Sequence, residues 1–426
     1  MKTPLSGGAK PFSMFTTHLV KVFEKSSYRR YWLAYSLSAL GFELVSFALM
    51  VVLFDITRKA VTMGAFMAIY MFCLVVFGPP AGIYIDRWNR KKIFIVCNIL
   101  LALLVLSLQF LTGLYWIYFS WFLASLFLVF LRPARIALIT NLFDQEDYLK
   151  ANSAFMMSLN FSKIGGPLIG GMLLIYFSRA WTINVILSIF LISSMLASLI
   201  PFQQPPAKSP HRVPTKRTWK NLAAGIRFIL SHERLRFYIS IGLLWRFFLA
   251  SQLPLYIVFV KDYLGGGTRE YSLFMTVLSA GGAVGALLAG GMGNRFSRKT
   301  MIYGGLGASY LLFALMALSQ SYLFALILIG LSNLFFFIAH VAIHSDIQRV
   351  TPNEIRGSVF ASSPTLLIPV GLISILIATP LADMVGVQWI FLFTGLLALS
   401  TLPLPAYLGG ALPREIQPSS QVQPVR

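Results

Sequence analysis

Three ionisable side chains interrupt long apolar stretches of the sequence. Glu43, Lys163 and Arg246 each lie ten to thirteen residues into such a stretch. A charge at the centre of an isolated membrane helix costs about 2.5–3.5 kcal/mol, so each side chain should face a wet space or a partner. Loss of water favours the neutral form of a carboxyl group, whereas an approaching cation favours its charged form. We therefore predict that Glu43 is a proton-coupling group; a purely structural ion pair between Glu43 and Lys163 is the alternative.

Other polar and aromatic residues in the apolar stretches could bind a cargo. Lys163 and Arg246 outweigh Glu43 by one positive charge, and the excess rises to three if Arg132 and Arg135 reach the same space rather than snorkel toward the membrane surface. Such a field repels cationic drugs and attracts a carboxylate or another anion. The predicted substrate-binding residues are Lys163, Arg246, Asn160, Gln252, Trp245, Asn333, Arg132, Arg135 and His340.

The elements that must position these residues are membrane-spanning helices. The chain of 426 residues is 57% hydrophobic and 12% charged, with a mean hydropathy of +0.75, whereas soluble domains carry about 25% charged residues. A bilayer core about 30 Å thick needs about 20 apolar residues in a helix. Twelve stretches satisfy this length, at 31–54, 62–85, 93–112, 114–135, 151–177, 181–201, 237–260, 271–293, 301–318, 322–345, 357–382 and 387–408. The sequence therefore predicts an all-α membrane protein and excludes a soluble enzyme.

Basic residues in the connections predict the orientation of these helices. With the N-terminus inside, 26 of the 35 Lys and Arg residues lie in cytoplasmic segments and 5 in external ones. Basic loops resist translocation, so both termini are expected in the cytoplasm, and the first apolar stretch is expected to be a retained span. The net charge of +21 is therefore concentrated at the cytoplasmic membrane surface, where anionic lipids attract it. This distribution argues against nucleic-acid binding.

One long connection separates six predicted spans from six more. It covers residues 202–236, contains four prolines, and includes at 219–230 the spacing of an amphipathic helix, which would lie on the inner leaflet or pack under the bundle. We predict four parts: an N-terminal six-helix bundle (1–201), the cytoplasmic linker, a C-terminal six-helix bundle (237–408) and a cytoplasmic tail (409–426).

A loop sequence occurs twice along the chain. The loop after the second predicted span reads Gly82-x-x-x-Asp86-Arg87-x-x-Arg90-Lys91-Lys92, and the loop after the eighth reads Gly290-x-x-x-Asn294-Arg295-x-x-Arg298-Lys299. Each matched residue of the first copy lies 208 positions before its counterpart in the second copy. The match indicates two homologous halves, related by a pseudo-twofold axis along the membrane normal because both halves begin on the same side.

The repeated loop resembles the signature of the major facilitator superfamily, and the resemblance covers the chain from about Tyr31 to Leu408. It implies that the loop bridges the two halves when the cytoplasmic side is closed, more weakly in the second copy, which has Asn for Asp. A second segment, Gly166-Pro167-x-x-Gly170-Gly171, looks like a helix-packing element of the superfamily's antiporters, with Ser162 where that element has glycine. The residues predicted to control conformation are Gly82, Asp86, Arg87, Arg90, Lys91, Gly290, Asn294, Arg295, Arg298, Gly166, Pro167, Gly170 and Gly171.

Two further stretches are similar to the exporter branch that contains macrolide and siderophore efflux proteins, namely Arg132–Arg135 and Asn353–Gly357. This resemblance implies a bacterial inner membrane, and we expect the protein to be a monomer. We expect a proton-coupled secondary transporter that exports an amphipathic, anionic small molecule such as a siderophore. Multidrug or macrolide efflux and lipid or lysophospholipid translocation are the alternatives. The sequence has no nucleotide-binding loop, hydrolase motif or metal-ligand cluster, so no enzymatic activity, cofactor or metal is expected.

Overall fold

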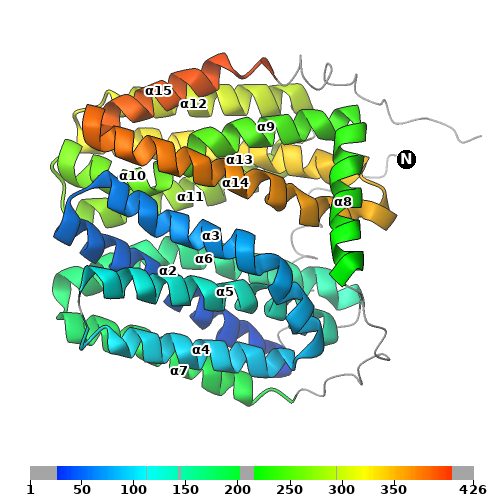
Figure 1. Ribbon diagram of the computed structural model, residues 1–426. Helices are drawn as coiled ribbons and strands as arrows, with labels where there is room; N and C mark the ends of the chain where they lie inside the picture. Colours follow the sequence, from blue (N-terminus) through cyan, green and yellow to red (C-terminus); the bar gives the residue numbers. More distant parts are fainter. Residues whose placement is uncertain (1–25, 112, 143–144, 202–214, 294, 405–426) are drawn as a thin grey trace, which may run out of the picture.

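The computed structural model describes residues 26–111, 113–142, 145–201, 215–293 and 295–404. Every regular element within these ranges is a helix, and the predicted all-α fold is confirmed. The helices form two groups that lie one above the other in Figure 1, with α2 to α7 in the lower group and α9 to α15 in the upper.

The N-terminal half consists of six helices that cross the bundle. They are α2 (Ser26–Thr57), α3 (Ala60–Arg87), α4 (Arg90–Ser107), α5 (Leu114–Leu142), α6 (Gln145–Tyr176) and α7 (Arg179–Ser198). Helix α2 packs on α6 and α7, α3 packs on α5, and α4 packs on α5 and α7. The predicted span 93–112 is too long at its end, because α4 stops at Ser107 and a turn follows.

The C-terminal half repeats this arrangement with two of its crossings broken into segments. The first crossing is α9 (Glu233–Ala250), α10 (Gln252–Val258) and the π-helix η1 (Phe259–Tyr263); then come α11 (Thr268–Met292), η2 (Thr300–Gly304) with α12 (Gly305–Ala317), α13 (Tyr322–Val350), α14 (Asn353–Val385) and α15 (Val387–Ser400). The predicted last span, 387–408, begins with α15, which ends at Ser400 in a turn. The described residues therefore contain twelve crossings.

Nine helices of the described chain are long and apolar enough to cross a membrane by length and composition. The other three crossings fall short for visible reasons. Helix α15 has 14 residues, α4 begins with three basic residues, and α6 carries Asn160 and Lys163 in its interior. Polar residues in the interior of a membrane helix are costly in lipid, so the polar residues of α6 indicate contact with a partner or with water.

The segment between the halves forms helix α8 (Thr215–Ser231), which stands across one end of the bundle (Figure 1). It packs on α14 and α9 of the C-terminal half. Gly225 makes the approach to α14 possible, because a side chain there would lie 2.8 Å from the carbonyl carbon of Ser358. Of the two arrangements that the amphipathic spacing allows, the structure has the helix packed against the bundle.

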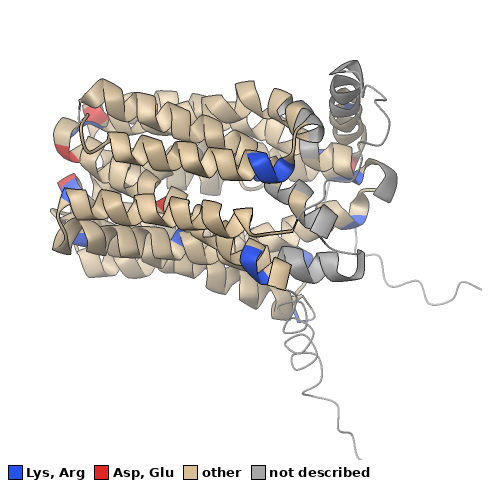
Figure 2. Ribbon diagram, turned by 90° about the horizontal axis from the view of Figure 1, so that it is seen from below, with Lys and Arg blue, Asp and Glu red and all other residues tan. Residues whose placement is uncertain are grey.

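The two halves are joined at the opposite end of the bundle, where the acidic segments gather in Figure 2. Lys261 Nζ lies 2.7 Å from the Asp55 carboxylate, and Arg58 lies 3.4 Å from the Asp262 carboxylate. Both ion pairs connect the end of α2 with η1 of the other half. This is the end that the basic residues predict to be extracellular, so the described state is closed there.

Asp383 adds a further contact between the halves at the same end. Its carboxylate, on α14, accepts hydrogen bonds from the backbone N–H groups of Ala60 and Val61 at 2.6 and 2.8 Å. These groups begin α3, where unpaired N–H donors and the positive end of the helix dipole favour an anion. The carboxylate of one half thus caps a helix of the other.

Asp383→Ala is expected to shift the protein toward states that are open at this end. Loss of a helix N-cap costs about 0.5–2 kcal/mol, which corresponds to a change of about 2- to 30-fold in the conformational equilibrium. The change is measurable as faster modification, by a water-soluble maleimide, of Ser272→Cys in a variant without the buried Cys73 and Cys97. Ser272 is buried between the halves in the described state.

Glu270→Ala is the matched control for this experiment. Glu270 also caps a helix N-terminus at this end, by accepting a hydrogen bond at 2.7 Å from the N–H of Gly267, but both residues belong to one half. Equal labelling rates in Asp383→Ala and its parent, or an equal increase in Glu270→Ala, would contradict a role for Asp383 in closing the two halves.

Candidate functional site

Glu43 lies at the middle of α2, where α6 comes very close. A side chain at Gly166 of α6 would lie 3.2 Å from the backbone carbonyl carbon of Glu43, so only glycine permits this approach. Lys163 lies one turn before Gly166 on the same face of α6, and its charge acts on the half-buried Glu43 carboxyl group. The glycine therefore brings the predicted acid and the predicted cation together.

Arg132 of α5 joins this pair from a third helix. Its guanidinium carbon lies 5.7 Å from the ring centre of Tyr70 on α3, over the face of that ring. The charge of Arg132 also acts on Glu43. Arg132 thus points toward the interior of the N-terminal half, which argues against the alternative in which it only anchors the helix at the membrane surface.

The C-terminal half contributes a cation and an aromatic wall. The Arg246 guanidinium of α9 lies 4.0 Å from the sulfur of Met71 on α3, so it reaches across to the other half. Trp245 packs on His340 of α13 with ring centres 4.8 Å apart, and the charge of Lys163 acts on His340 from the opposite half. Phe336 and Phe337 complete the aromatic group around His340.

These residues form a polar cluster, which we define as Glu43, Tyr70, Arg132, Lys163, Arg246 and His340. Arg132 and Lys163 are exposed although both lie well inside their helices, so the protein does not cover either side chain. Three cations oppose one acid in the cluster, a net charge of +2 when Glu43 is ionised and His340 neutral. The ion pairs between described residues lie near the ends of the bundle, and none includes Glu43. The described geometry does not support the structural Glu43–Lys163 ion pair.

Two predicted cargo residues lie inside the C-terminal half instead. Gln252 is buried and accepts a hydrogen bond at 3.0 Å from the Tyr256 hydroxyl. The Asn333 amide donates to the carbonyl oxygen of Leu278 at 2.6 Å, which ties α13 to α11. Both line a small pocket within this half. The hydrogen bond of Gln252 lies within α10 and that of Asn333 joins two helices, whereas Asn160 is exposed on α6, one turn before Lys163.

Two described basic residues of the repeated loop, Lys91 and Arg298, contact their own half. Lys91 Nζ donates hydrogen bonds at 2.7 Å to the carbonyl oxygens of Ser198 and Ile200 at the end of α7. Arg298 pairs with Asp346, which also accepts a hydrogen bond at 2.7 Å from the Tyr238 hydroxyl. Arg90 is half-buried at the start of α4, and Gly290 and Arg295 are exposed. A bridge between the halves through this loop remains a prediction for another state.

Some predicted residues lie outside what the structure describes. Asn294 is not among the described residues, and the side-chain surroundings of Gly82, Asp86, Arg87 and Arg135 are likewise outside them.

The Gly-Pro segment of α6 serves two interfaces. Gly166 and Gly170 face α2 of the same half, whereas Gly171 packs on Ser272 of α11 in the other half. The Ser272 hydroxyl also donates a hydrogen bond at 2.7 Å to the carbonyl oxygen of Pro167. The segment therefore contacts both halves, and two of its three glycines serve packing within the N-terminal bundle.

Sequence reasoning missed Tyr70 and Met71, which bring α3 into the cluster. A tyrosine at the centre of the stretch 62–85 is a polar group at membrane depth, and this was the available signal. Its position relative to Arg132 depends on how α3 and α5 are rotated against each other, which composition does not reveal.

Twelve membrane crossings in two halves around an accessible polar cluster define a membrane transporter. The chain belongs to the Major Facilitator Superfamily, whose family model matches residues 31–367. The resemblance of the repeated loop is thereby confirmed, and the protein is a transport protein and not an enzyme.

Known relatives and structures agree with this assignment. Macrolide efflux protein A of Streptococcus pyogenes is 24% identical over 382 residues, which cover 86% of this chain and 92% of that protein. Enterobactin exporter EntS of Shigella dysenteriae serotype 1 is 22% identical over 346 residues, 78% of this chain and 80% of that protein. A crystal structure of a bacterial homologue of the human lysosomal transporter Spinster superposes with a TM-score of 0.71 at 12% identity, covering 94% of this chain and 98% of that one.

Proposed function

We propose that this transporter exports an amphipathic, anionic small molecule from the cytoplasm by proton-coupled alternating access. It would act as a monomer in the cell inner membrane, with both termini in the cytoplasm. The observation that carries the proposal is the polar cluster, in which three cations and one acid from both halves lie together and two of the cations are exposed. The names of the relatives, an efflux protein and an exporter, support the outward direction.

The charges of the cluster favour an anion. Arg132, Lys163 and Arg246 give the site an excess of positive charge, and a carboxylate can accept charge-assisted hydrogen bonds from each of them. A lipophilic cation would be repelled by the same field. The aromatic wall of Trp245, Phe336 and Phe337 would take the apolar part of the cargo. A siderophore with carboxylate groups has both features.

Glu43 is the proposed proton-carrying group because it shares its cations with the cargo. The ionised carboxylate offsets the positive charges of Lys163 and Arg132. When Glu43 is protonated and neutral, both cations are available to bind an anionic cargo. Binding of the anion and protonation of Glu43 are therefore linked, and each promotes the other. For proton entry to drive export, the cargo-loaded carrier would release the Glu43 proton to the cytoplasm before it opens outward. The weaker binding of the anion to the ionised form would then free the cargo outside, and the empty carrier would return with Glu43 protonated.

Uptake into inverted membrane vesicles tests the cargo class. We expect a carboxylate siderophore to accumulate when a proton gradient is imposed, and tetraphenylphosphonium, a lipophilic cation, to stay at the level of vesicles without the protein. Accumulation of the lipophilic cation alone would overturn the anionic preference.

Macrolide efflux is the second candidate, and the aromatic group around His340 favours it. Aromatic rings packed at an angle to one another form an adaptable surface for a bulky apolar ligand, as in the tilted contact of Trp245 with His340 and its edge-to-face contact with Phe336. The same vesicles distinguish the two candidates, since a macrolide that accumulates while the siderophore does not would favour this one.

A further inference from the structure

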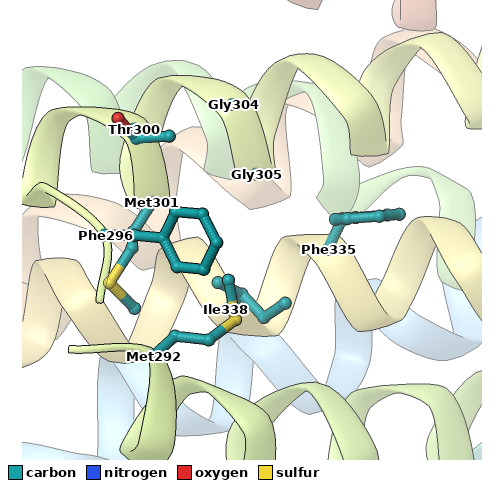
Figure 3. A pocket seen from close by; sticks show the side chains of 8 residues that line it. All are labelled: Met292, Phe296, Thr300, Met301, Gly304, Gly305, Phe335 and Ile338. Atoms are coloured by element: carbon teal, nitrogen blue, oxygen red, sulfur yellow. The ribbon is translucent and has the colours of Figure 1, made fainter. Parts of the chain in front are cut away.

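A groove opens on the C-terminal half near the repeated loop. It lies between α11, the segment η2–α12 and α13, and its volume is about 240 Å³. Figure 3 shows side chains from these elements converging on it. The apolar lining includes Met292, Phe296, Met301, Phe335 and Ile338, with the backbone of Gly304 on one side. All of these residues belong to one half, so the groove is separate from the polar cluster between the halves.

The mouth of the groove is accessible. Phe296 is 48% exposed, and Gly304 is exposed with no atom within 4 Å of the position that its side chain would take. The groove contains almost no polar group that could orient a small polar ligand, and its volume is below the roughly 300–1,000 Å³ of typical small-molecule pockets. Its size and lining suit a length of hydrocarbon chain.

Two basic residues stand beside this mouth. Arg295 directly precedes Phe296, Lys299 directly precedes Thr300, and both are exposed. Neither has an ion-pair partner among the described residues, whereas Arg298 of the same loop is held by Asp346. An apolar slot is therefore flanked by two cations at the end of the bundle, which is the level of lipid headgroups.

We propose that this groove is a binding site for one anionic phospholipid. An acyl chain would fill the apolar slot, and the headgroup phosphate would contact Arg295 and Lys299. Basic residues near a membrane surface attract anionic lipids, and pockets between membrane helices that carry them bind lipid headgroups. The bound lipid would pack the repeated loop against α13, beside the Arg298–Asp346 pair.

Native mass spectrometry of the purified full chain in detergent tests this site. The protein is titrated with dioleoylphosphatidylglycerol and, in parallel, with the zwitterionic dioleoylphosphatidylcholine. We expect one phosphatidylglycerol molecule to bind about tenfold or more tightly than any phosphatidylcholine. Gly304→Leu should remove this tight binding, because the leucine side chain would occupy the groove. The double variant Arg295→Gln with Lys299→Gln should reduce phosphatidylglycerol binding to the level of phosphatidylcholine.

Gly291→Leu is the matched control. Gly291 lies near the same end of α11, is exposed with open space around it, and does not line the groove, so its lipid binding should equal that of the unmodified protein. Equal affinity for the two lipids, or tight phosphatidylglycerol binding that persists in the Arg295→Gln and Lys299→Gln variant, would overturn the proposal. The double variant leaves the helices unchanged, so it decides the question even if Gly304→Leu folds poorly.

Discussion

Glu43→Gln is expected to abolish gradient-driven accumulation of the cargo while leaving exchange of cargo across the membrane intact. Glutamine has nearly the same shape as the protonated acid but cannot release a proton. A proton gradient then has no group to act on, because Glu43 is the only described carboxylate in the polar cluster. Exchange should continue, since the neutral side chain leaves Lys163 and Arg132 to the cargo.

The same substitution should remove the pH dependence of cargo binding. In the unmodified protein, affinity for an anion should rise as the pH falls, because protonation of Glu43 frees the cations that the carboxylate holds. In Glu43→Gln the affinity should be independent of pH and equal to the low-pH value of the unmodified protein. Isothermal titration of the purified protein with the anionic cargo at several pH values measures both quantities.

Glu233→Gln is the matched control for both measurements, because Glu233 is exposed in the first turn of α9. It should accumulate cargo and respond to pH as the unmodified protein does. Accumulation that survives in Glu43→Gln, or an unchanged pH dependence of binding, would remove Glu43 from the coupling scheme.

The fold could be predicted because the bilayer imposes a length on every crossing. About twenty apolar residues are needed per helix, and the turn-forming and basic residues between them locate the connections. The structure differs mainly at helix ends, for example where α6 begins at Gln145, six residues before the predicted stretch. Such ends lie outside the hydrocarbon, where composition constrains the chain less.

The candidate site could be predicted only in part, because a membrane helix that is apolar all round does not show which face it turns to its neighbours. Depth along the helix could be counted, and it placed Glu43, Lys163 and Arg246 at one level. The sequence does not give the rotation of each helix about its own axis. Gln252 and Asn333 were therefore grouped with these three residues, although both face the interior of the C-terminal half. The close approach at Gly166 determines the rotation of α6, and it follows from packing against α2.

Removing the cations of the cluster is expected to weaken transport of an anion in steps. A hydrogen bond to a charged group contributes about 1.5–3 kcal/mol, and the exposure of Lys163 favours the lower value, so Lys163→Ala should raise the KM for the anion about tenfold. Arg246→Ala, in which the lost side chain is half-buried, should have at least this effect. The double variant should transport the anion no faster than vesicles without the protein.

Two exposed basic residues at the other end of the bundle supply matched controls. Lys59→Ala and Arg269→Ala remove the same kinds of charge outside the polar cluster and should leave KM unchanged. Lys163→Arg retains the positive charge and should restore most of the anion transport, which a purely structural role of the lysine would not predict. If Lys163→Ala and Arg246→Ala both transport the anion like the unmodified protein, then the cargo binds elsewhere.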